Sequence, residues 1–479
     1  MQKFLSIAVT IGALFAIRTP GDAATPVLTT LYSFTGVNPA DDVGGAFPEA
    51  GVVINNNNLF GTTYAGGAGW GSVYELAPPA QTGGAWTMHQ LYAFTGGADG
   101  SNPRAAVIFS SRGVIFGTTE QGGAFGYGTV FSLTPAGNGT WTQAVIYSFA
   151  GAPVGCGTTG NPACDGANPE SGLVLTPKGL LYGTTAAGGT GGYGAAFSMT
   201  PATGGTWTEK VMYSFIGAPT GCGTTGNQAC DGAVPLGGLT LVPATGVVYG
   251  TTYSGGTAGY GTVFRLVQSG SVWNETVLYS FNGAFSGVGE TPPVPCGTSG
   301  QPVCDGGAPD GNVVINSATG ALFGTTTLGG NPAGCPQGGY EQGCGAIFQL
   351  TPPVAPSTTW TESLLYAFTG APQDGIIPAS NIVMPSSTGP LYGTTFAGGA
   401  AGINVCFPQS YTGCGIVYTL RPPVAPSTTW TKADLAVFNG DNGGGPNGVV
   451  LSSGGGVLYG TTYDGGLSGG YGTIFQLTF

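Results

Sequence analysis

The sequence predicts an all-β fold, a seven-bladed β-propeller of four-stranded blades. Three observations predict it. The triplet Gly-Thr-Thr recurs along the 479-residue chain at spacings of 56 to 74 residues. The same four strand-like runs surround each triplet, which marks a tandem repeat. The two ends of the chain carry complementary strand types, which would close a ring. The triplets begin at Gly61, Gly117, Gly183, Gly250, Gly324, Gly393 and Gly460.

The four runs of each repeat differ in composition, which orders them within a blade. In the third repeat they begin at Gly172, Leu180, Gly194 and Trp207. First runs are apolar and follow small residues, which suits the innermost strand beside a crowded central channel. Fourth runs carry charges and suit an exposed outer edge. These charged residues include Glu209, Lys210, Glu275, Glu362 and Lys432. Helices are not expected, because no window shows a helical apolar period free of Gly and Pro.

The termini predict how the ring closes. The run from Leu28 to Phe34 matches a fourth strand, and the chain ends on a third strand, Thr473 to Leu477. The N-terminal strand is therefore expected to complete the last blade and remove its open edge. A linear solenoid is the alternative, but it leaves the match of the termini unexplained.

The composition limits the possible classes of protein and of binding partner. With 93 Gly, 35 Pro and a mean hydropathy of +0.21, the chain is turn-rich and apolar enough to fold. The formal net charge of −12 disfavours a nucleic-acid partner, because phosphates require clustered Lys and Arg. We expect a monomer with no nucleic-acid partner.

The first residues predict export. Lys3 precedes an apolar run from Leu5 to Ile17, and the small residues Ala23 and Ala24 suit a cleavage site. A membrane anchor is less favoured, since a spanning helix needs about 20 apolar residues. We therefore expect a signal peptide over residues 1–24 and one propeller domain over residues 25–479. The mature protein would be secreted, periplasmic or on the cell surface, without a transmembrane segment.

Ten cysteines fall into five close pairs. An even count, local pairing and an export signal together predict disulfides. A zinc site is disfavoured because the gaps within the pairs are long and the chain has one His. The pairs are Cys156 with Cys164, Cys222 with Cys230, Cys296 with Cys304, Cys335 with Cys344, and Cys406 with Cys414.

The predicted loops on one face of the propeller collect both the cysteines and the acids. Loops from a fourth to a first strand and from a second to a third strand emerge on this face. They hold all five cysteine pairs and 15 of the 21 acidic residues, and Arg104 is their only base. Long acidic loops on a nearly uncharged scaffold mark this face as the functional candidate.

An Asp-Gly step precedes a Pro in five of these loops. Asp before Gly is a favoured turn pair, so the first interpretation is structural. The alternative is that the carboxylates ring the mouth of the channel and bind a cation such as calcium, the one cofactor considered. The residues are Asp99, Asp165, Asp231, Asp305 and Asp374.

Further candidates lie in the same loops. Aromatic residues recur just before the third strands, where they either cap the blades or offer flat surfaces to sugar rings. The residue after the recurring Pro varies between blades, and at the channel mouth Glu49, Glu170 or Asp310 would be suited to a carboxylate pair for glycoside cleavage. Arg104 completes the set of binding candidates. The aromatic residues are Trp70, Tyr127, Tyr193, Tyr260 and Tyr471.

The motifs LYGTT, AGG, YGTVF and WT, in this order, resemble the GloVer tandem-repeat family of exported bacterial proteins over the whole mature chain. The layout is also similar to kelch repeats, which have a double glycine after the second strand and a Trp on the fourth. The GloVer resemblance implies export and surface display, often through a C-terminal sorting anchor, whereas this chain ends in FQLTF. It implies no particular activity.

The leading hypothesis is a secreted or surface-displayed binding module whose acidic, disulfide-stiffened face binds a glycan, a cation or a protein. The first alternative is an extracellular polysaccharide hydrolase or lyase, and the second is a structural envelope protein. Carboxylates that converge with aromatic residues in one place would favour a glycan-active protein, and carboxylates spread singly around a rim would not.

Overall fold

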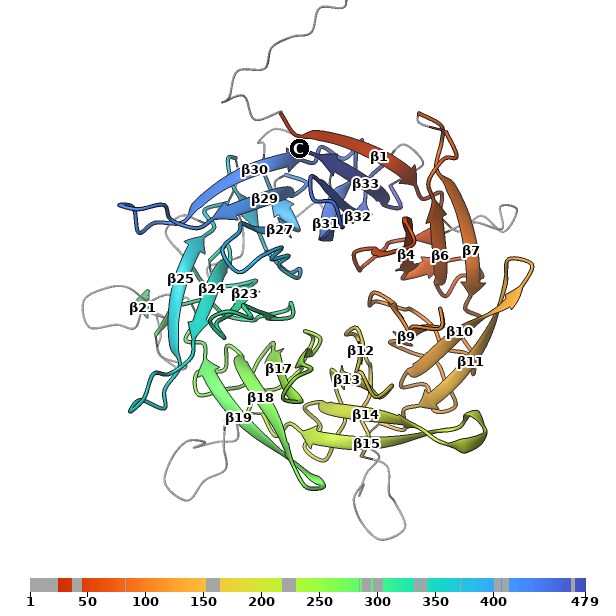
Figure 1. Ribbon diagram of the computed structural model, residues 1–479, viewed down its shortest axis with the longest axis horizontal. Coiled ribbons are helices and arrows are strands. Elements are labelled where there is room, and N and C mark those ends of the chain that lie inside the picture. The colour runs from red at the N-terminus through yellow and green to blue at the C-terminus, as the bar shows by residue number, and fades with distance from the viewer. Residues whose placement is uncertain are drawn as a thin grey trace, which may run out of the picture.

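A computed structural model describes residues 25–36, 45–81, 83–151, 164–217, 230–283, 285–286, 294–295, 305–330, 335, 343–370, 372–399, 406, 413–466 and 470–479. Within them the chain forms seven small antiparallel sheets arranged as a ring (Figure 1). The predicted seven-bladed β-propeller is therefore confirmed. The predicted signal peptide, residues 1–24, lies outside the described residues.

The strands of each blade lie in the following order from the ring axis outward. Blade 1 contains β3 (Val53–Asn55), β4 (Asn58–Thr63), β6 (Ser72–Ala77) and β7 (Thr87–Ala93); blade 2 contains β8 (Ile108–Phe109), β9 (Ile115–Thr119), β10 (Thr129–Gly137) and β11 (Thr140–Ser148). Blade 3 contains β12 (Val174–Leu175), β13 (Leu181–Thr185), β14 (Ala195–Pro201) and β15 (Trp207–Ser214); blade 4 contains β16 (Thr240–Val242), β17 (Val247–Thr252), β18 (Thr262–Ser269) and β19 (Val272–Ser280).

The remaining blades follow the same order. Blade 5 contains β22 (Val314–Ile315), β23 (Leu322–Thr326), β24 (Ala346–Thr351) and β25 (Thr361–Ala367); blade 6 contains β27 (Leu391–Thr395), β29 (Ile416–Arg421) and β30 (Thr431–Val437); blade 7 contains β31 (Gly444–Leu451), β32 (Val457–Asp464), β33 (Thr473–Thr478) and β1 (Val27–Ser33). Three loop ribbons pair β2 (Gly45–Ala46) with β5 (Ala65–Gly66), β20 (Phe285–Ser286) with β21 (Val294–Pro295), and β26 (Gly375–Ile376) with β28 (Ala397–Gly398). A single 3-10 turn, Thr203–Gly205, is the one helical element of the described chain.

Blade 6 departs from the predicted four strands. Its innermost run is reduced to one bridge, in which Val383 and Tyr392 exchange both backbone hydrogen bonds. In blade 3 the ladder extends one step further, because Thr176 donates its N–H to Leu180. Pro385 stands at the equivalent place in blade 6. Proline has no N–H to donate, so the ladder stops there.

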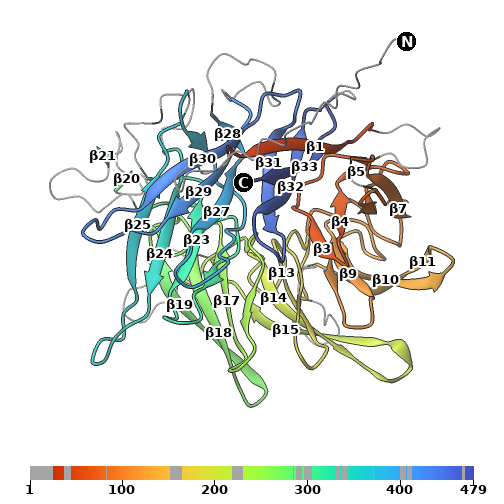
Figure 2. The same cartoon turned by 45° about the horizontal axis from the view of Figure 1, so that its top comes forward.

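The N-terminal strand closes the ring as predicted. Strand β1 pairs with β33 at the junction of the two ends of the chain (Figure 1, Figure 2). A hydrogen bond from the Thr461 hydroxyl to the Ala50 carbonyl, 2.8 Å long, then joins the last blade to the first. Each blade therefore has a neighbouring blade on both sides, and the ring has no terminal blade with an open side.

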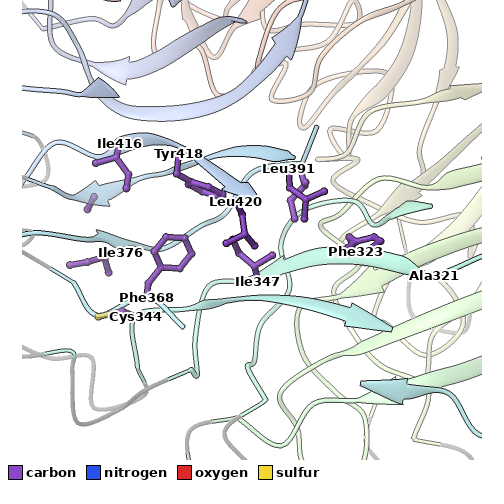
Figure 3. Packing of buried hydrophobic residues seen from close by; sticks show 12 residues of the cluster. Ala321, Phe323, Cys344, Ile347, Phe368, Ile376, Leu391, Ile416, Tyr418 and Leu420 are labelled. Carbon is purple, nitrogen blue, oxygen red and sulfur yellow. The ribbon is translucent and has the colours of Figure 1, made fainter. Parts of the chain in front are cut away.

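The core lies between the blades. A buried Phe at the end of each fourth strand packs edge-on against an aromatic ring on the third strand of the next blade, with ring centroids 5.1 to 5.4 Å apart. Figure 3 shows one such contact, between Phe368 and Tyr418, among the aliphatic residues of blades 5 and 6. The seven pairs are Phe34–Tyr74, Phe94–Phe131, Phe149–Phe197, Phe215–Phe264, Phe281–Phe348, Phe368–Tyr418 and Phe438–Phe475.

The glycine of the Gly-Thr-Thr triplet makes room for these rings. A methyl group at Gly117 would lie 2.5 Å from Cζ of Phe131. The same clash would arise in every blade, with the aromatic ring of the third strand in each case. Only glycine lets the ring lie flat on the neighbouring strand.

The two threonine hydroxyls of the triplet form hydrogen bonds in two directions, one to the next blade and one within their own blade. In blade 2, the Thr118 hydroxyl donates to the Ser171 carbonyl of the next blade, at 3.1 Å. The Thr119 hydroxyl bonds to the Thr129 hydroxyl within its own blade, at 2.8 Å. One triplet therefore fills the core, links neighbouring blades and pairs two strands, which explains its recurrence.

The fourth strands differ from the sequence-based expectation of exposed charges. Lys210 is exposed, but Glu209, Glu275 and Glu362 are partly buried, and the Lys432 side chain is only 7% exposed. These four residues share a strand face with the Trp two positions earlier. That face packs toward the preceding blade, so the charges lie in the clefts between blades.

Candidate functional site

The two kinds of loop predicted to share one face are hydrogen-bonded to each other. In blade 1, β2 pairs with β5, and in blade 6, β26 pairs with β28. Isolated bridges join the same loops in other blades, including Ser101 to Gln121 and Ala167 to Ala187. The described parts of these two kinds of loop therefore lie on the same face of the ring.

The chain enters every blade through the same turn. The residue before the recurring Pro has a positive φ, for example 57° at Asn102, and donates its N–H to the preceding blade, here to the Trp70 carbonyl at 2.8 Å. The residue after the Pro lies next to the innermost strand, and it differs in each blade. These seven positions hold Glu49, Arg104, Glu170, Leu236, Asp310, Ala379 and Asn447.

Arg104 brings the carboxylates of three blades together. Its Nε lies 2.5 Å from Oε2 of Glu49, and its Nη1 lies 2.6 Å from Oε2 of Glu170. Oε2 of Glu120 is 3.8 Å from the same Nη1 and accepts no hydrogen bond from the described part of the chain. The guanidinium side chain is 37% exposed, whereas the three glutamates are 13 to 19% exposed. We call Glu49, Arg104, Glu120, Glu170 and Asp310 the central cluster.

Asp310 interacts electrostatically with this cluster from a more distant blade. It enters blade 5, three blades beyond Arg104, yet its charge interacts with those of Arg104 and Glu49. Burial raises the pKa of Asp310 to about 6, although Arg104 opposes the shift. Burial also raises the pKa values of Glu49 and Glu170, against the lowering effect of the same guanidinium. One Arg therefore does not neutralise the cluster, and perturbed carboxylates of this kind are frequent at functional sites.

Aromatic rings border the central cluster. The Arg104 guanidinium carbon lies 6.0 Å from the centroid of the Tyr64 ring. Tyr463 interacts electrostatically with Glu49 and Arg104, and its ring stacks on Phe47 at 5.1 Å. Tyr64 and Tyr463 are both partly exposed. The cluster thus combines hydrogen-bonding charges with flat apolar faces.

The five Asp-Gly aspartates lie elsewhere. Each carboxylate accepts a hydrogen bond from a Tyr hydroxyl on the outermost strand of the preceding blade and from a nearby backbone N–H. In one instance the Tyr147 hydroxyl and the Ala150 N–H both donate to Asp165, at 2.6 and 3.1 Å. The Tyr partners of Asp99, Asp165, Asp231, Asp305 and Asp374 are Tyr92, Tyr147, Tyr213, Tyr279 and Tyr366. These contacts fasten each loop to the outer strand.

The recurring aromatic residues have one packed and one open face. A methyl group at Gly96 would lie 2.5 Å from the Trp70 ring, and Gly151 approaches the Tyr127 ring in the same way. Trp70, Tyr127 and Tyr193 nevertheless remain 46 to 48% exposed. They pack on the glycine that follows each outermost strand, so they lie outward of the central cluster. Tyr260 and Tyr471 pack on Gly283 and Gly36 and are less exposed.

A family model for the Gloeobacter/Verrucomicrobia repeat matches residues 7–240. This match covers just under half of the chain, so this part of the sequence is similar to the Gloeobacter/Verrucomicrobia repeat family. A comparison with curated proteins finds no match.

Solved structures similar to this repeat protein differ widely in sequence. A hypothetical selenium-binding protein from Sulfolobus tokodaii is 8% identical, with a TM-score of 0.49 over 93% of this chain and 90% of its own. An ulvan lyase is 8% identical, with a TM-score of 0.44 over 94% and 95%. A Hadza microbial sialidase is 11% identical, with a TM-score of 0.35 over 78% and 64%. Likeness at these levels carries no information about activity.

Two of the seven repeats replace the recurring aromatic residue with a cysteine. Cys344 and Cys414 stand at this position in blades 5 and 6 and form disulfides with Cys335 and Cys406. Both predicted pairings are thereby confirmed. Cys164 and Cys230 are also disulfide-bonded, while their predicted partners Cys156 and Cys222, and the pair Cys296 and Cys304, lie outside the described residues.

The sequence analysis found Glu49, Arg104, Glu170 and Asp310 but missed the residues that surround them. Tyr64, Glu120 and Tyr463 each directly follow a Gly-Thr-Thr triplet. The signal was available, because the residue after the triplet differs in chemical type between blades while the triplet itself is constant. Of the described residues, no three from His, Cys, Asp and Glu are grouped so as to hold a metal ion. No helix of the described chain is long and apolar enough to cross a membrane.

Proposed function

We propose that this propeller is an exported glycan-binding module whose binding site is the central cluster. The observation that carries the proposal is the convergence of Glu49, Arg104 and Glu170 from three consecutive blades, with Asp310 opposite them. Sugar hydroxyls pair well with charged donors and acceptors, and the apolar faces of sugar rings stack on aromatic residues such as Tyr64 and Tyr463.

The charge of the cluster indicates which glycans suit it. Three carboxylates lie within 3.8 Å of one guanidinium and Asp310 adds a fourth acidic group, so a polyanionic chain of uronic acids or sulfated sugars would be repelled. We therefore propose a neutral or amino-sugar polymer as ligand. Calcium is not needed for this mode, because the five Asp-Gly aspartates already accept internal hydrogen bonds.

The disulfides Cys335–Cys344 and Cys406–Cys414 support an oxidising location for this function. Together with the signal-like N-terminus, they support a secreted, periplasmic or cell-surface protein. The open outer faces of Trp70 and Tyr127 would extend the sugar-binding surface outward if the ligand is a long chain.

A glycan array tests the proposal. The oxidised protein should bind neutral or amino glycans equally with calcium and with EDTA. Glu49→Gln and Glu170→Gln should each weaken binding at least about tenfold, as expected for one charged hydrogen bond of about 1.5–3 kcal/mol. Glu209→Gln is the matched control, because it makes the same chemical change in an outer cleft. No binding would leave a structural envelope role as the better explanation, and binding only with calcium would redirect attention to the aspartates.

A second candidate is a glycoside hydrolase built on the same cluster. The observation that favours it is Asp310, whose pKa burial raises to about 6, beside glutamates that would serve as the second carboxylate. A carboxyl with a pKa near 6 carries its proton in mildly acidic solution and is suited to general acid catalysis there. Release of reducing ends from a bound glycan, abolished in Asp310→Asn without loss of binding, would separate this activity from simple binding.

A further inference from the structure

The outer wall of the ring contains a second repeated arrangement, independent of the central cluster. The arrangement recurs in five clefts, each between two neighbouring blades. In each cleft, the aspartate of an Asp-Gly step faces a side chain of the next blade, namely the residue two positions after the Trp of that blade. The facing residues of Asp99, Asp165, Asp231, Asp305 and Asp374 are Gln143, Glu209, Glu275, Glu362 and Lys432. The aspartate and its Tyr partner are constant, and only the facing residue changes its charge.

The cleft between blades 5 and 6 binds an ammonium group that the chain itself provides. Nζ of Lys432 lies 2.7 Å from Oδ1 of Asp374 and 2.5 Å from Oδ1 of Asp434. It also lies 5.7 Å from the centroid of the Tyr366 ring, within the range of a cation–π contact. The Lys432 side chain is 7% exposed, so the cleft surrounds the ammonium almost completely.

The preceding cleft has the same frame without the lysine. Tyr279 donates to Asp305 at 2.5 Å, as Tyr366 does to Asp374 at 2.9 Å. Glu362 stands in the place of Lys432, and a cavity of about 500 Å³ opens there. Its lining includes Tyr279, Asn282, Asp305, Trp360, Glu362 and Leu364.

One carboxyl oxygen of Glu362 has no hydrogen-bond partner among the described residues. Its Oε1 atom is shielded from solvent and accepts no hydrogen bond from the described residues. Burial and the nearby Asp305 charge raise the pKa of Glu362 to about 8. An unpartnered carboxylate beside a second one is the arrangement that a bound cation would stabilise.

We propose that the cleft between blades 4 and 5 binds a primary alkylammonium group from solution, placed between Asp305 and Glu362 as Lys432 is placed in the next cleft. Trp360 and Leu364 supply apolar walls for the alkyl chain, and the Tyr279 ring takes the place of Tyr366. A bare calcium ion suits the cleft less well, because calcium takes six to eight oxygen ligands and the cleft offers two carboxylates.

Titration of a labelled tryptophan tests the proposal. The protein carries 5-fluorotryptophan, and the Trp360 signal is assigned with Trp360→Phe. Nα-acetyl-lysine methylamide should shift this fluorine resonance saturably, whereas its Nε-acetylated form, which has no charge, should not. An equal shift with the neutral compound, no shift with either, or a saturable shift with calcium chloride alone would overturn the proposal.

Two variants locate the site. Glu362→Lys should fill the cleft with its own ammonium and abolish the shift, while the same substitution at Glu209, in another cleft, should leave it unchanged. Glu362→Gln keeps the shape of the side chain and should weaken binding at least about tenfold, so the test stands even if the lysine variant folds poorly. A shift that persists at full affinity in both Glu362 variants would contradict the assignment.

Binding should also depend on pH in a defined direction. The titratable groups that face the cleft are Glu362, Asp305 and Tyr279. Since Glu362 must lose its proton to pair with the ammonium, affinity should rise between pH 6 and pH 8.5 in the wild type and stay level in Glu362→Gln. A level profile in the wild type would count against the pairing with Glu362. Because glycan binding at the central cluster does not involve this cleft, the two proposals can fail separately.

Discussion

The sulfur of Cys344 lies against Gly370 just as the ring of Tyr260 lies against Gly283. A methyl group at Gly370 would lie 2.9 Å from Sγ of Cys344, and one at Gly283 would lie 2.7 Å from the Tyr260 ring. The disulfide and the aromatic ring therefore do the same packing task in neighbouring blades. Both cover the glycine that follows the outermost strand.

This equivalence predicts that tyrosine can replace the disulfide. Cys335→Ser/Cys344→Ser should lose about 2–3 kcal/mol of unfolding free energy, as expected for a bridge that closes a short loop. Cys335→Ser/Cys344→Tyr should recover at least about 1 kcal/mol of that loss, because the ring again covers Gly370. Guanidinium unfolding of the oxidised proteins measures the difference. Equal losses in the two variants would mean that the sulfur and the ring are not interchangeable.

Ring closure should be as strong as any internal blade contact. Phe34 packs on Tyr74 with centroids 5.4 Å apart, and the internal pair Phe94 and Phe131 is 5.1 Å apart. Phe34→Ala and Phe94→Ala should each cost about 3–5 kcal/mol, since each removes a fully buried ring. The same unfolding measurement compares them. A much smaller cost for Phe34→Ala would show that the N-terminal strand closes the ring only weakly.

The triplet glycine should not tolerate even a methyl group. In Gly250→Ala the new carbon would lie 2.4 Å from Cζ of Phe264, so the ring must shift, at a cost of about 1–3 kcal/mol. Gly172→Ala is the control, because its nearest neighbour, the Ala106 carbonyl, would be 3.6 Å away. We expect the control to change stability by less than about 0.5 kcal/mol. Thermal unfolding of both variants checks the contrast, and similar losses would contradict it.

Stability should fall as pH rises toward the alkaline range. Burial raises the pKa values of Glu209 and Glu275 to about 8, from 4.5 for the ordinary group. Between these values the unfolded chain has released protons that the folded chain keeps, so the free energy of unfolding decreases with pH. The loss begins near pH 4.5 and is complete above about pH 8.

The double variant Glu209→Gln/Glu275→Gln replaces the two carboxyl groups whose titration lowers the free energy of unfolding. We expect it to be more stable than the wild type at pH 9 by about 1–2 kcal/mol, a value reduced for the partial exposure of both side chains. Unfolding measured at pH 5, 7 and 9 gives the slope. If the wild type and the variant lose stability in parallel, the glutamates are ionised in the folded protein at neutral pH.

The fold was predictable because each recurring residue makes the same contact in every blade. Gly117 makes room for a ring, Thr118 binds the next blade and Thr119 pairs two strands. Such contacts involve neighbouring repeats only, so they appear in the sequence as a period. The three-stranded sixth blade was not predicted, since it depends on whether Pro385 falls on a residue that must donate a hydrogen bond.

The candidate site was predictable only in part. Glu49 and Asp310 stood out as variable residues at a constant position, and the sequence alone determined that they lie on the loop face. The contact of Glu49 with Arg104 and the effect of Arg104 on the pKa of Asp310 are properties of the closed ring, which relates residues of the first, second and fifth blades. In the same way, the sequence predicted that Glu362 and Lys432 lie on the exposed outer edge. The packing of neighbouring blades instead places them opposite Asp305 and Asp374. A repeat pattern specifies the contacts that every blade shares, whereas contacts between unlike residues of different blades exist only once the ring has closed.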